Sequence, residues 1–132
     1  MLEYLSVRTG KKIQFVDISR EIKSIVEKHG IKSGLCTIYV PHTTAGVTIN
    51  ENSDPDVVTD MIMEINKLVP FKDGYLHMEG NSAAHIQASL IGASQSVIIE
   101  NGRLLLGTWQ GIYFCEFDGP RERKVIVKLM EG

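Results

Sequence analysis

Residues 96–130 read SVIIENGRLLLGTWQGIYFCEFDGPRERKVIVKLM. Runs of β-branched and aromatic residues alternate in this segment with two groups of turn residues, Asn101-Gly102 and Asp118-Gly119-Pro120. We therefore expect four strands, over residues 96–100, 104–106, 111–117 and 124–130. So many strands joined by short turns indicate a largely antiparallel sheet.

The first half of the chain adds three more strand-like runs. Residues 2–7 and 12–16 flank the turn Thr9-Gly10-Lys11, and this arrangement predicts a β-hairpin. The run LCTIYV over residues 35–40 is apolar throughout, which is typical of a buried central strand, and Pro41 ends it.

Three segments have the spacing of helices. The first follows Asp17 or Ser19 as N-cap and stops at Gly30, and the third runs over 82–91, between Asn81 as N-cap and Gly92. The second begins at Asp54-Pro55. Its apolar face is expected to be buried and comprises Val57, Val58, Met61, Ile62, Ile65 and Leu68, whereas Asp56, Asp60 and Glu64 face solvent. The predicted class is α+β: a single compact domain over residues 1–132, with a largely antiparallel β-sandwich-like sheet and about three helices.

Length and composition exclude several classes of protein. A chain of 132 residues is one domain, and a net charge of -2 leaves no basic stripe for nucleic acid. No stretch is apolar enough to cross a membrane, and the first ten residues do not have the pattern of a secretory signal. Cys36 and Cys115 lie in apolar runs and are expected to be reduced and buried, so we predict a cytoplasmic protein.

The charge is unevenly distributed along the chain. Between His42 and Asn101 there are two basic and eight acidic residues, a net charge of −6, and three of the four histidines. Glu51, Asp54 and Glu79 flank these histidines in segments that we expect to be loops. A divalent cation bound among them would relieve the repulsion between the carboxylates.

His42 follows the predicted central strand, in a polar segment that also contains Thr43 and Thr44. Loops that leave a rigid strand often carry functional groups. The alternative is that His42 packs against the following helix and that the nearby acids cap that helix.

His77 and His85 form a second candidate pair, the first in a loop and the second one turn into the third helix. Three neutral imidazoles converging on one zinc ion, with an open fourth position, is a common catalytic arrangement. The alternative is three unrelated histidines, each with its own hydrogen bonds. The fourth histidine, His29, lies in the last turn of the first helix and is assigned to no site.

Two further side chains are candidates for binding substrate. Trp109 occupies a turn, where its ring would stack on a flat heterocycle or anchor the core. Arg121 and Arg123 follow the Asp118-Gly119-Pro120 turn, and either guanidinium would clamp a phosphate or else be solvated at a strand edge. Arg121 is the better candidate because it adjoins the turn.

Three segments together resemble the YjbQ family, a group named as secondary thiamine-phosphate synthase. They are PHTTAGVTINENSDPDV at 41–57, HMEGNSAAHIQASLIG at 77–92 and GRLLLGTWQGIYFCEFDGPRERKV at 102–125. The resemblance implies a compact α+β fold, a homotrimer and, in some members, a metal such as zinc at a histidine cluster. The implied metal ligands are His42, His77 and His85, with Glu51, Asp54, Asn81 and Arg121 lining the same pocket.

From the residues and this resemblance we predict a metal-dependent enzyme acting on small phosphorylated metabolites. Its reaction would join a pyrimidine pyrophosphate to a thiazole phosphate, with zinc as cofactor and magnesium as the alternative. Glu51, Asp54 and Arg121 are the predicted catalytic residues. Substrate binding is assigned to Thr43, Thr44, Asn81, Trp109 and Arg121. Two alternatives are a zinc-assisted hydrolase with Glu51 or Glu79 as general base, and a metal-stabilised trimeric binding module without turnover.

Overall fold

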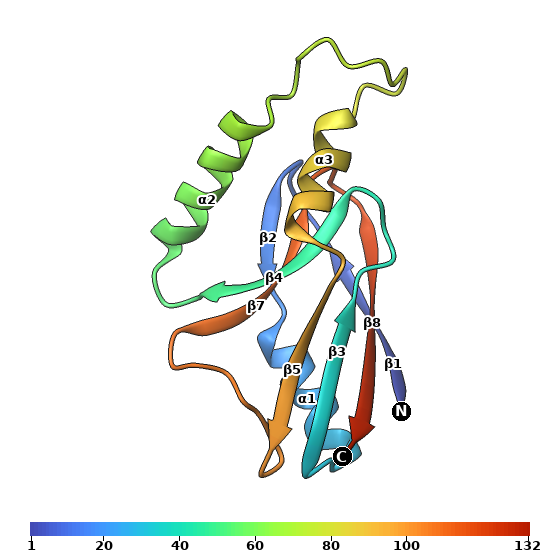
Figure 1. Cartoon of the computed structure of the whole chain (residues 1–132), viewed down its shortest axis with the longest axis vertical. Helices are drawn as coiled ribbons and strands as arrows, with labels where there is room; N and C mark the ends of the chain where they lie inside the picture. Colours follow the sequence, from blue (N-terminus) through green and yellow to red (C-terminus); the bar gives the residue numbers. More distant parts are fainter.

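A computed structural model describes all residues, 1–132, as one α+β domain (Figure 1). The strands are β1 (Leu2–Arg8), β2 (Gln14–Asp17), β3 (Ser33–Tyr39), β4 (Ala45–Glu51), β5 (Ser94–Glu100), β6 (Arg103–Leu104), β7 (Gln110–Glu116) and β8 (Glu122–Glu131). The helices are α1 (Ser19–His29), α2 (Pro55–Leu68) and α3 (Ser82–Ile91). The predicted fold class is confirmed.

The strands form two antiparallel sheets. One has the order β1-β8-β3-β5-β6 and the other the order β2-β7-β4. Seventeen buried residues drawn from both sheets and α1 form the main core between them. The run LCTIYV lies largely in β3, next to β8 and β5, so the predicted central strand is also confirmed.

Strand β7 is buried on both faces, which explains its unbroken apolar sequence. Ile112 and Phe114 belong to the main core, whereas Tyr113 and Cys115 belong to a second cluster. That second cluster also contains Ala84 of α3. The three-stranded sheet is thus packed between the five-stranded sheet on one side and helices α2 and α3 on the other.

The N-cap of α1 is Ile18 and not Asp17 or Ser19 as predicted, and Asn81 precedes α3 without a side-chain capping hydrogen bond. The other helix ends follow the predicted signals. Gly30 closes α1 with a left-handed φ of 64°. Asp54 caps α2 by accepting a hydrogen bond from the Asp56 backbone N–H at 2.9 Å, and Pro55 occupies the first turn. No helix is both long enough and apolar enough to cross a membrane.

Three further local predictions are wrong. Strands β1 and β2 do not form a hairpin: β1 pairs with β8, and β2 pairs with β7 in the other sheet. Residues 45–51, expected to be part of a polar loop, form β4 and pair with β7. Leu68, expected on the buried face of α2, is 74% exposed, whereas the other residues of that face are partly buried, four of them against the second cluster: Val58, Met61, Ile62 and Ile65. Figure 1 shows α2 standing beside the body of the domain.

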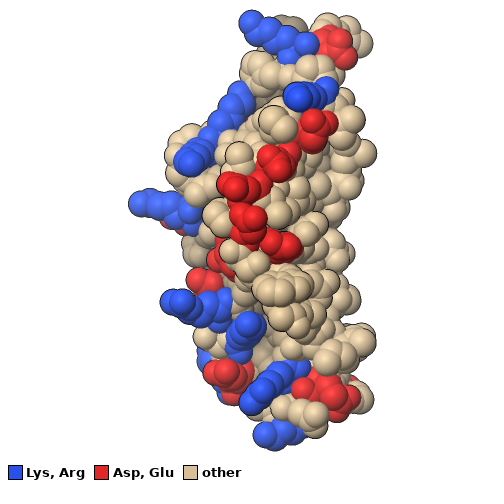
Figure 2. Space-filling view, turned by 90° about the vertical axis from the view of Figure 1, so that its left-hand side faces the viewer, with Lys and Arg blue, Asp and Glu red and all other residues tan.

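Three acidic residues of the segment between His42 and Asn101 lie on α2. Asp56, Asp60 and Glu64 are all exposed on this helix, as the sequence predicted. Figure 2 shows acidic side chains as a stripe along the face that includes α2, with basic side chains beside it. Most of the negative charge is therefore spread over a solvated surface and is not concentrated around the histidines.

Both cysteines are buried free thiols, as predicted. Burial raises the pKa of the Cys36 thiol to about 11, and it raises the pKa of Cys115 as well. Both side chains therefore pack as small apolar groups at neutral pH.

Candidate functional site

His42 lies in the link between β3 and β4, and one hydrogen bond fixes its ring. The backbone N–H of Lys124, in β8, donates to Nε2 of His42 at 2.9 Å. A neutral imidazole that accepts a hydrogen bond at Nε2 carries its proton on Nδ1. His42 therefore has an N–H donor at Nδ1 and no free acceptor nitrogen.

Charged groups of both signs lie near His42. Burial lowers the pKa of His42, and so do the guanidinium groups of Arg123 and Arg121. The backbone hydrogen bond from Lys124 and the charge of Glu116 act in the opposite direction, but the net pKa is below the ordinary value. His42 is thus held as a neutral hydrogen-bond donor.

Arg123 belongs to a buried network beneath His42. Its Nε donates to Oε2 of Glu116 at 2.8 Å, and its Nη2 donates to Oγ1 of Thr44 at 2.8 Å. The side chains of Arg123 and Glu116 are 3% and 0% exposed. The Thr44 hydroxyl is therefore engaged within the protein, where it orients Arg123, and it does not point into an open site.

His85 of α3 lines the same hollow as His42. The hollow has a volume of about 490 Å³, and Thr43 and Ser89 also line it. Its shape depends on the packing of β4 against the end of α3: a Cβ atom on Gly46 would lie 2.6 Å from the carbonyl oxygen of Gly92. The structure thus brings together His42, Thr43 and His85 of the predicted site.

His77 lies on the other side of His85. The two rings meet edge to face with their centroids 5.6 Å apart, and both line a neighbouring hollow. Nε2 of His77 is 3.9 Å from Oε1 of Glu79, the one acid of the segment between His42 and Asn101 within ion-pair distance of a site histidine. His85 therefore separates His42 from His77.

A polar chain continues from Glu79 to the β7–β8 turn. The Nδ2 group of Asn81 donates to Oε2 of Glu79 at 3.1 Å and to Oδ2 of Asp118 at 2.9 Å. Nη2 of Arg121 donates to the same Asp118 oxygen at 3.2 Å. Arg121 is still about half exposed, so its guanidinium faces solvent near His42.

Three predicted site residues lie elsewhere in the chain. Glu51 ends β4 and pairs with Gln110, and the Asn52 backbone N–H donates to the carbonyl of Trp109. Asp54 caps α2 nearby. The seven-residue strand β4 separates this group from His42, a length of about 20 Å at the usual rise per residue. Within one chain, Glu51, Asp54 and Trp109 do not share a pocket with the histidines.

Comparison with known proteins identifies the family. The family model described as "UPF0047 protein YjbQ-like" matches residues 3–132. The chain belongs to the YjbQ family. The UPF0047 protein YugU of Bacillus subtilis is 55% identical to this YjbQ chain over 98% of this chain and 99% of its own length. A UPF0047 protein of Methanocaldococcus jannaschii is 51% identical over 98% and 94% of the two chains.

Solved structures of YjbQ proteins have the same fold. A YjbQ/UPF0047 protein of Clostridium acetobutylicum, 54% identical, superimposes with a TM-score of 0.95 over 97% of this chain and 99% of that one. A Sulfolobus solfataricus protein described as of unknown function is 33% identical, with a TM-score of 0.96 over 100% and 97% of the two chains. These comparisons establish the family and the fold.

The predicted zinc site requires His42, His77 and His85 to lie around one position in this YjbQ chain. No group of three or more His, Cys, Asp or Glu side chains is placed to hold one metal ion. His42 would have to give up its hydrogen bond from Lys124 to offer Nε2. The pair His77 and His85 fits better: zinc–nitrogen bonds of about 2.0–2.1 Å allow two ring centroids to lie up to about 6 Å apart, and these lie 5.6 Å apart.

The role of Arg123 was not predicted from the sequence, and Glu116 was not among the candidate residues. Two signals were available. Glu116 interrupts the apolar run IYFCEF, and Arg123 shares the inward alternation of Val125, Val127 and Leu129 in β8. A charged residue at a core-facing position of each of two strands indicates a buried ion pair.

Proposed function

We propose that this YjbQ protein is an enzyme that binds a small phosphorylated metabolite in the hollow between His42 and His85. The observation that carries the proposal is the fixed Nδ1–H donor of His42 near the half-exposed guanidinium group of Arg121. Neutral donors and guanidinium groups together bind phosphate oxygens well. The second histidine across the hollow, His85, is then placed to contact the same ligand.

The reaction that we propose is the formation of thiamine phosphate. The thiazole nitrogen attacks the methylene carbon of the pyrimidine, the C–O bond breaks, and its electron pair leaves with pyrophosphate. His42 and Arg121 would hold the oxygens of the departing pyrophosphate, whose negative charge grows as the bond breaks.

In this proposal, a divalent metal would be bound only by His77 and His85. Zinc, or magnesium as the alternative, would supply further positive charge for the phosphate oxygens. The substrate would approach from the hollow shared with His42, because His85 lines both hollows.

We further propose that the enzyme is a cytoplasmic homotrimer. Support for assembly comes from the outer face of the five-stranded sheet, where Leu35 pairs with both Ile98 and Met130. These three side chains are 44%, 51% and 56% exposed. A contiguous apolar area of this kind is typical of a protein–protein interface. Light scattering on the purified protein measures the mass of the particle, and a monomeric mass would contradict the trimer.

The test is a turnover assay on the purified full chain. The pyrimidine pyrophosphate and thiazole phosphate are supplied together with and without added zinc or magnesium, and both thiamine phosphate and released pyrophosphate are measured. We expect His42→Ala and His85→Ala each to reduce the rate by about 100-fold. His29→Ala is the matched control, because His29 lies on α1 and its ring pairs with Glu3.

Each outcome separates the alternatives. Release of phosphate or pyrophosphate without the second substrate would indicate a hydrolase. Binding of the substrates without turnover would indicate a binding module. Site variants that behave like His29→Ala would show that the chemistry does not take place in this hollow.

A further inference from the structure

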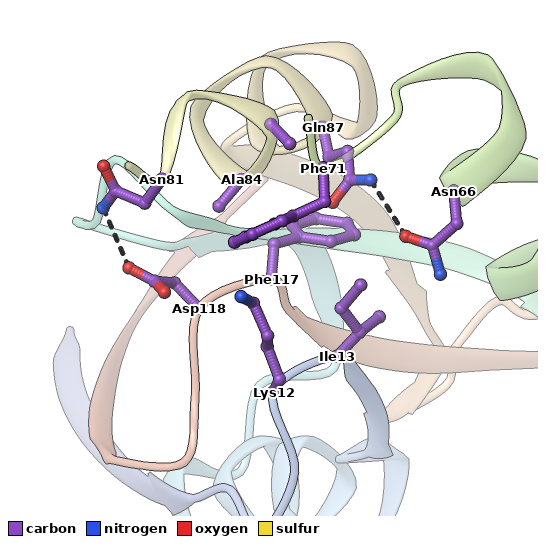
Figure 3. Close-up of a pocket in the computed structure, with 10 residues that line it drawn as sticks. Lys12, Ile13, Asn66, Phe71, Asn81, Ala84, Gln87, Phe117 and Asp118 are labelled. Carbon is purple, nitrogen blue, oxygen red and sulfur yellow. Dashed lines mark hydrogen bonds between the residues drawn. The ribbon is translucent and has the colours of Figure 1, made fainter. Parts of the chain in front are cut away.

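A second cavity is lined in part by Asn81 and Asp118, and the function proposed above does not use it. Its volume is about 280 Å³. Figure 3 shows it between α3, the segment that follows α2, and the segments next to β2 and β7. The volume is near the lower limit of ligand-binding pockets, which fits a ligand of a single ring.

Two phenylalanine rings form the apolar part of this cavity. Phe117 is 1% exposed and belongs to the second core cluster, whereas Phe71 is 50% exposed and lies in the segment between α2 and α3. Figure 3 shows both rings extending into the same space. Aromatic faces in a cavity of this size favour a flat, unsaturated ligand, because stacked rings gain more than the burial of area alone.

A positive charge lies at the edge of the cavity. The Nζ atom of Lys12 is 3.6 Å from the centroid of the Phe71 ring. None of the ion pairs of the chain involves Lys12, so its ammonium group has no carboxylate partner. A ligand with an anionic substituent would supply the missing partner.

An amide oxygen that faces the cavity also has no hydrogen-bond partner in the chain. Gln87 is 2% exposed, and its Nε2 group donates to Oδ1 of Asn66 and to the carbonyl of Val69, both at 3.2 Å. The Oε1 atom of Gln87 accepts no hydrogen bond from the chain, and Figure 3 shows it turned toward the phenylalanine rings. The one buried side-chain atom without a partner is Oδ1 of Asn81, at the edge of the cavity, and Figure 3 shows it turned away from the phenylalanine rings. The Gln87 oxygen, which faces an apolar cavity without a partner, favours a ligand with an N–H donor.

We propose that this cavity binds a single planar aromatic ring that carries both an N–H donor and an anionic group. The ring lies against Phe71 and Phe117, the N–H group donates to Oε1 of Gln87, and the anion pairs with Lys12. The donor and the anion together distinguish this ligand class from plain aromatic compounds, which would contact only the two phenylalanine rings.

The test uses aminobenzoate as the probe, with its ortho, meta and para isomers measured separately. Each isomer is titrated into the ¹⁵N-labelled full chain while backbone amide signals are followed. Benzoate lacks the donor and aniline lacks the anion, so each serves as a matched compound. We expect at least one aminobenzoate to saturate the signals of Ala84, Gln87 and Asp118 with an affinity about tenfold better than either matched compound.

Variants then assign the contacts. We expect Lys12→Met to lower the affinity for the aminobenzoate about tenfold, to that of aniline, and Phe71→Ala to lower it similarly. Lys11→Met is the matched control, because Lys11 is an exposed neighbour that does not line the cavity. Lys12 and Phe71 are both exposed, so these changes should leave the fold intact. The proposal is overturned if no isomer saturates, if Lys12→Met binds as well as Lys11→Met, or if the shifts map to Thr43 and Ser89 instead.

Discussion

The backbone N–H of Lys124 donates to Nε2 of His42 at 2.9 Å, so a β8 residue determines which nitrogen of a histidine between β3 and β4 carries the proton. The two segments are far apart in sequence but adjacent in the sheet, because β3 and β8 are paired. This hydrogen bond from a backbone N–H distinguishes His42 from the other two site histidines, His77 and His85.

The first prediction concerns the protonation of His42. Burial and Arg123 lower its pKa in the folded state below the ordinary value of 6.5. As the pH falls below about 6.5, the unfolded chain therefore takes up a proton that the folded chain resists, and the free energy of unfolding decreases. Urea unfolding at several pH values should show this slope, and His42→Gln should reduce it because glutamine still accepts the Lys124 hydrogen bond without titrating.

Nitrogen NMR of the imidazole rings gives the matching structural measurement. We expect the His42 ring at neutral pH to be protonated on Nδ1. His29→Gln is the control for the unfolding experiment and should leave the slope assigned to His42 in place. A proton on Nε2 of His42, or a titration at or above pH 6.5, would contradict the assignment.

The second prediction concerns zinc. Because Nε2 of His42 is engaged and the rings of His77 and His85 lie 5.6 Å apart, we expect only the latter two to bind the ion. In competition with a coloured chelator, His77→Ala and His85→Ala should each weaken zinc binding by about tenfold or more. His42→Ala should bind zinc as the natural chain does, and His29→Ala is the control. Equal losses in all three site variants would mean that the histidines converge after all.

The third prediction concerns the buried ion pair. Burial alone would raise the pKa of the Glu116 carboxyl, but hydrogen bonds from Arg123, Asp118 and Thr9 hold the pKa below its ordinary value. Arg123→Met removes the main donor and leaves a buried carboxylate, which should cost about 3–5 kcal/mol of unfolding free energy. The loss should be smaller at acidic pH, where Glu116 takes up a proton.

Two further variants test the origin of that loss. Combining Arg123→Met with Glu116→Gln removes both charges and should restore a large part of the stability. Arg8→Met breaks an exposed pair, in which Arg8 and Glu122 are 82% and 53% exposed, and should cost at most about 1 kcal/mol. If Arg123→Met were as mild as Arg8→Met, the buried pair would have no special role.

The sequence predicted the elements with strong local signals. Asp54-Pro55 and Gly30 mark helix ends through local hydrogen bonds and backbone angles, and the strands β3, β7 and β8 have unmistakable apolar runs. The predicted hairpin failed because strand pairing depends on contacts between distant residues. A short turn between two strand-like runs cannot indicate that β1 and β2 join different sheets.

The candidate site was predicted only in part, again because contacts between distant residues bring it together. The segment that follows Pro41 is rich in polar residues and was interpreted as a loop, which would have let Glu51 and Asp54 fold back toward His42. Its alternating Val47 and Ile49 were the available sign of strand β4, and a strand carries its two ends apart. His42, Thr43 and His85 come together because β4 and α3 pack against each other, a tertiary contact without a local signal.

The fourth prediction tests the pairing of β3 with β8, which also positions Lys124 beneath His42. Gly34 in β3 has a φ of 154°, and a Cβ atom there would lie 1.9 Å from the backbone oxygen of Met130. Backbone atoms of a central strand cannot move aside as a flexible side chain can. Gly34→Ala should therefore separate the strands locally and lower the free energy of unfolding by about 1–3 kcal/mol or more. Gly10→Ala is the matched control, since the nearest atom to its Cβ is Oε1 of Gln14 at 3.9 Å. Urea unfolding measures both variants, and equal stability of the two would contradict the close approach of β3 to β8.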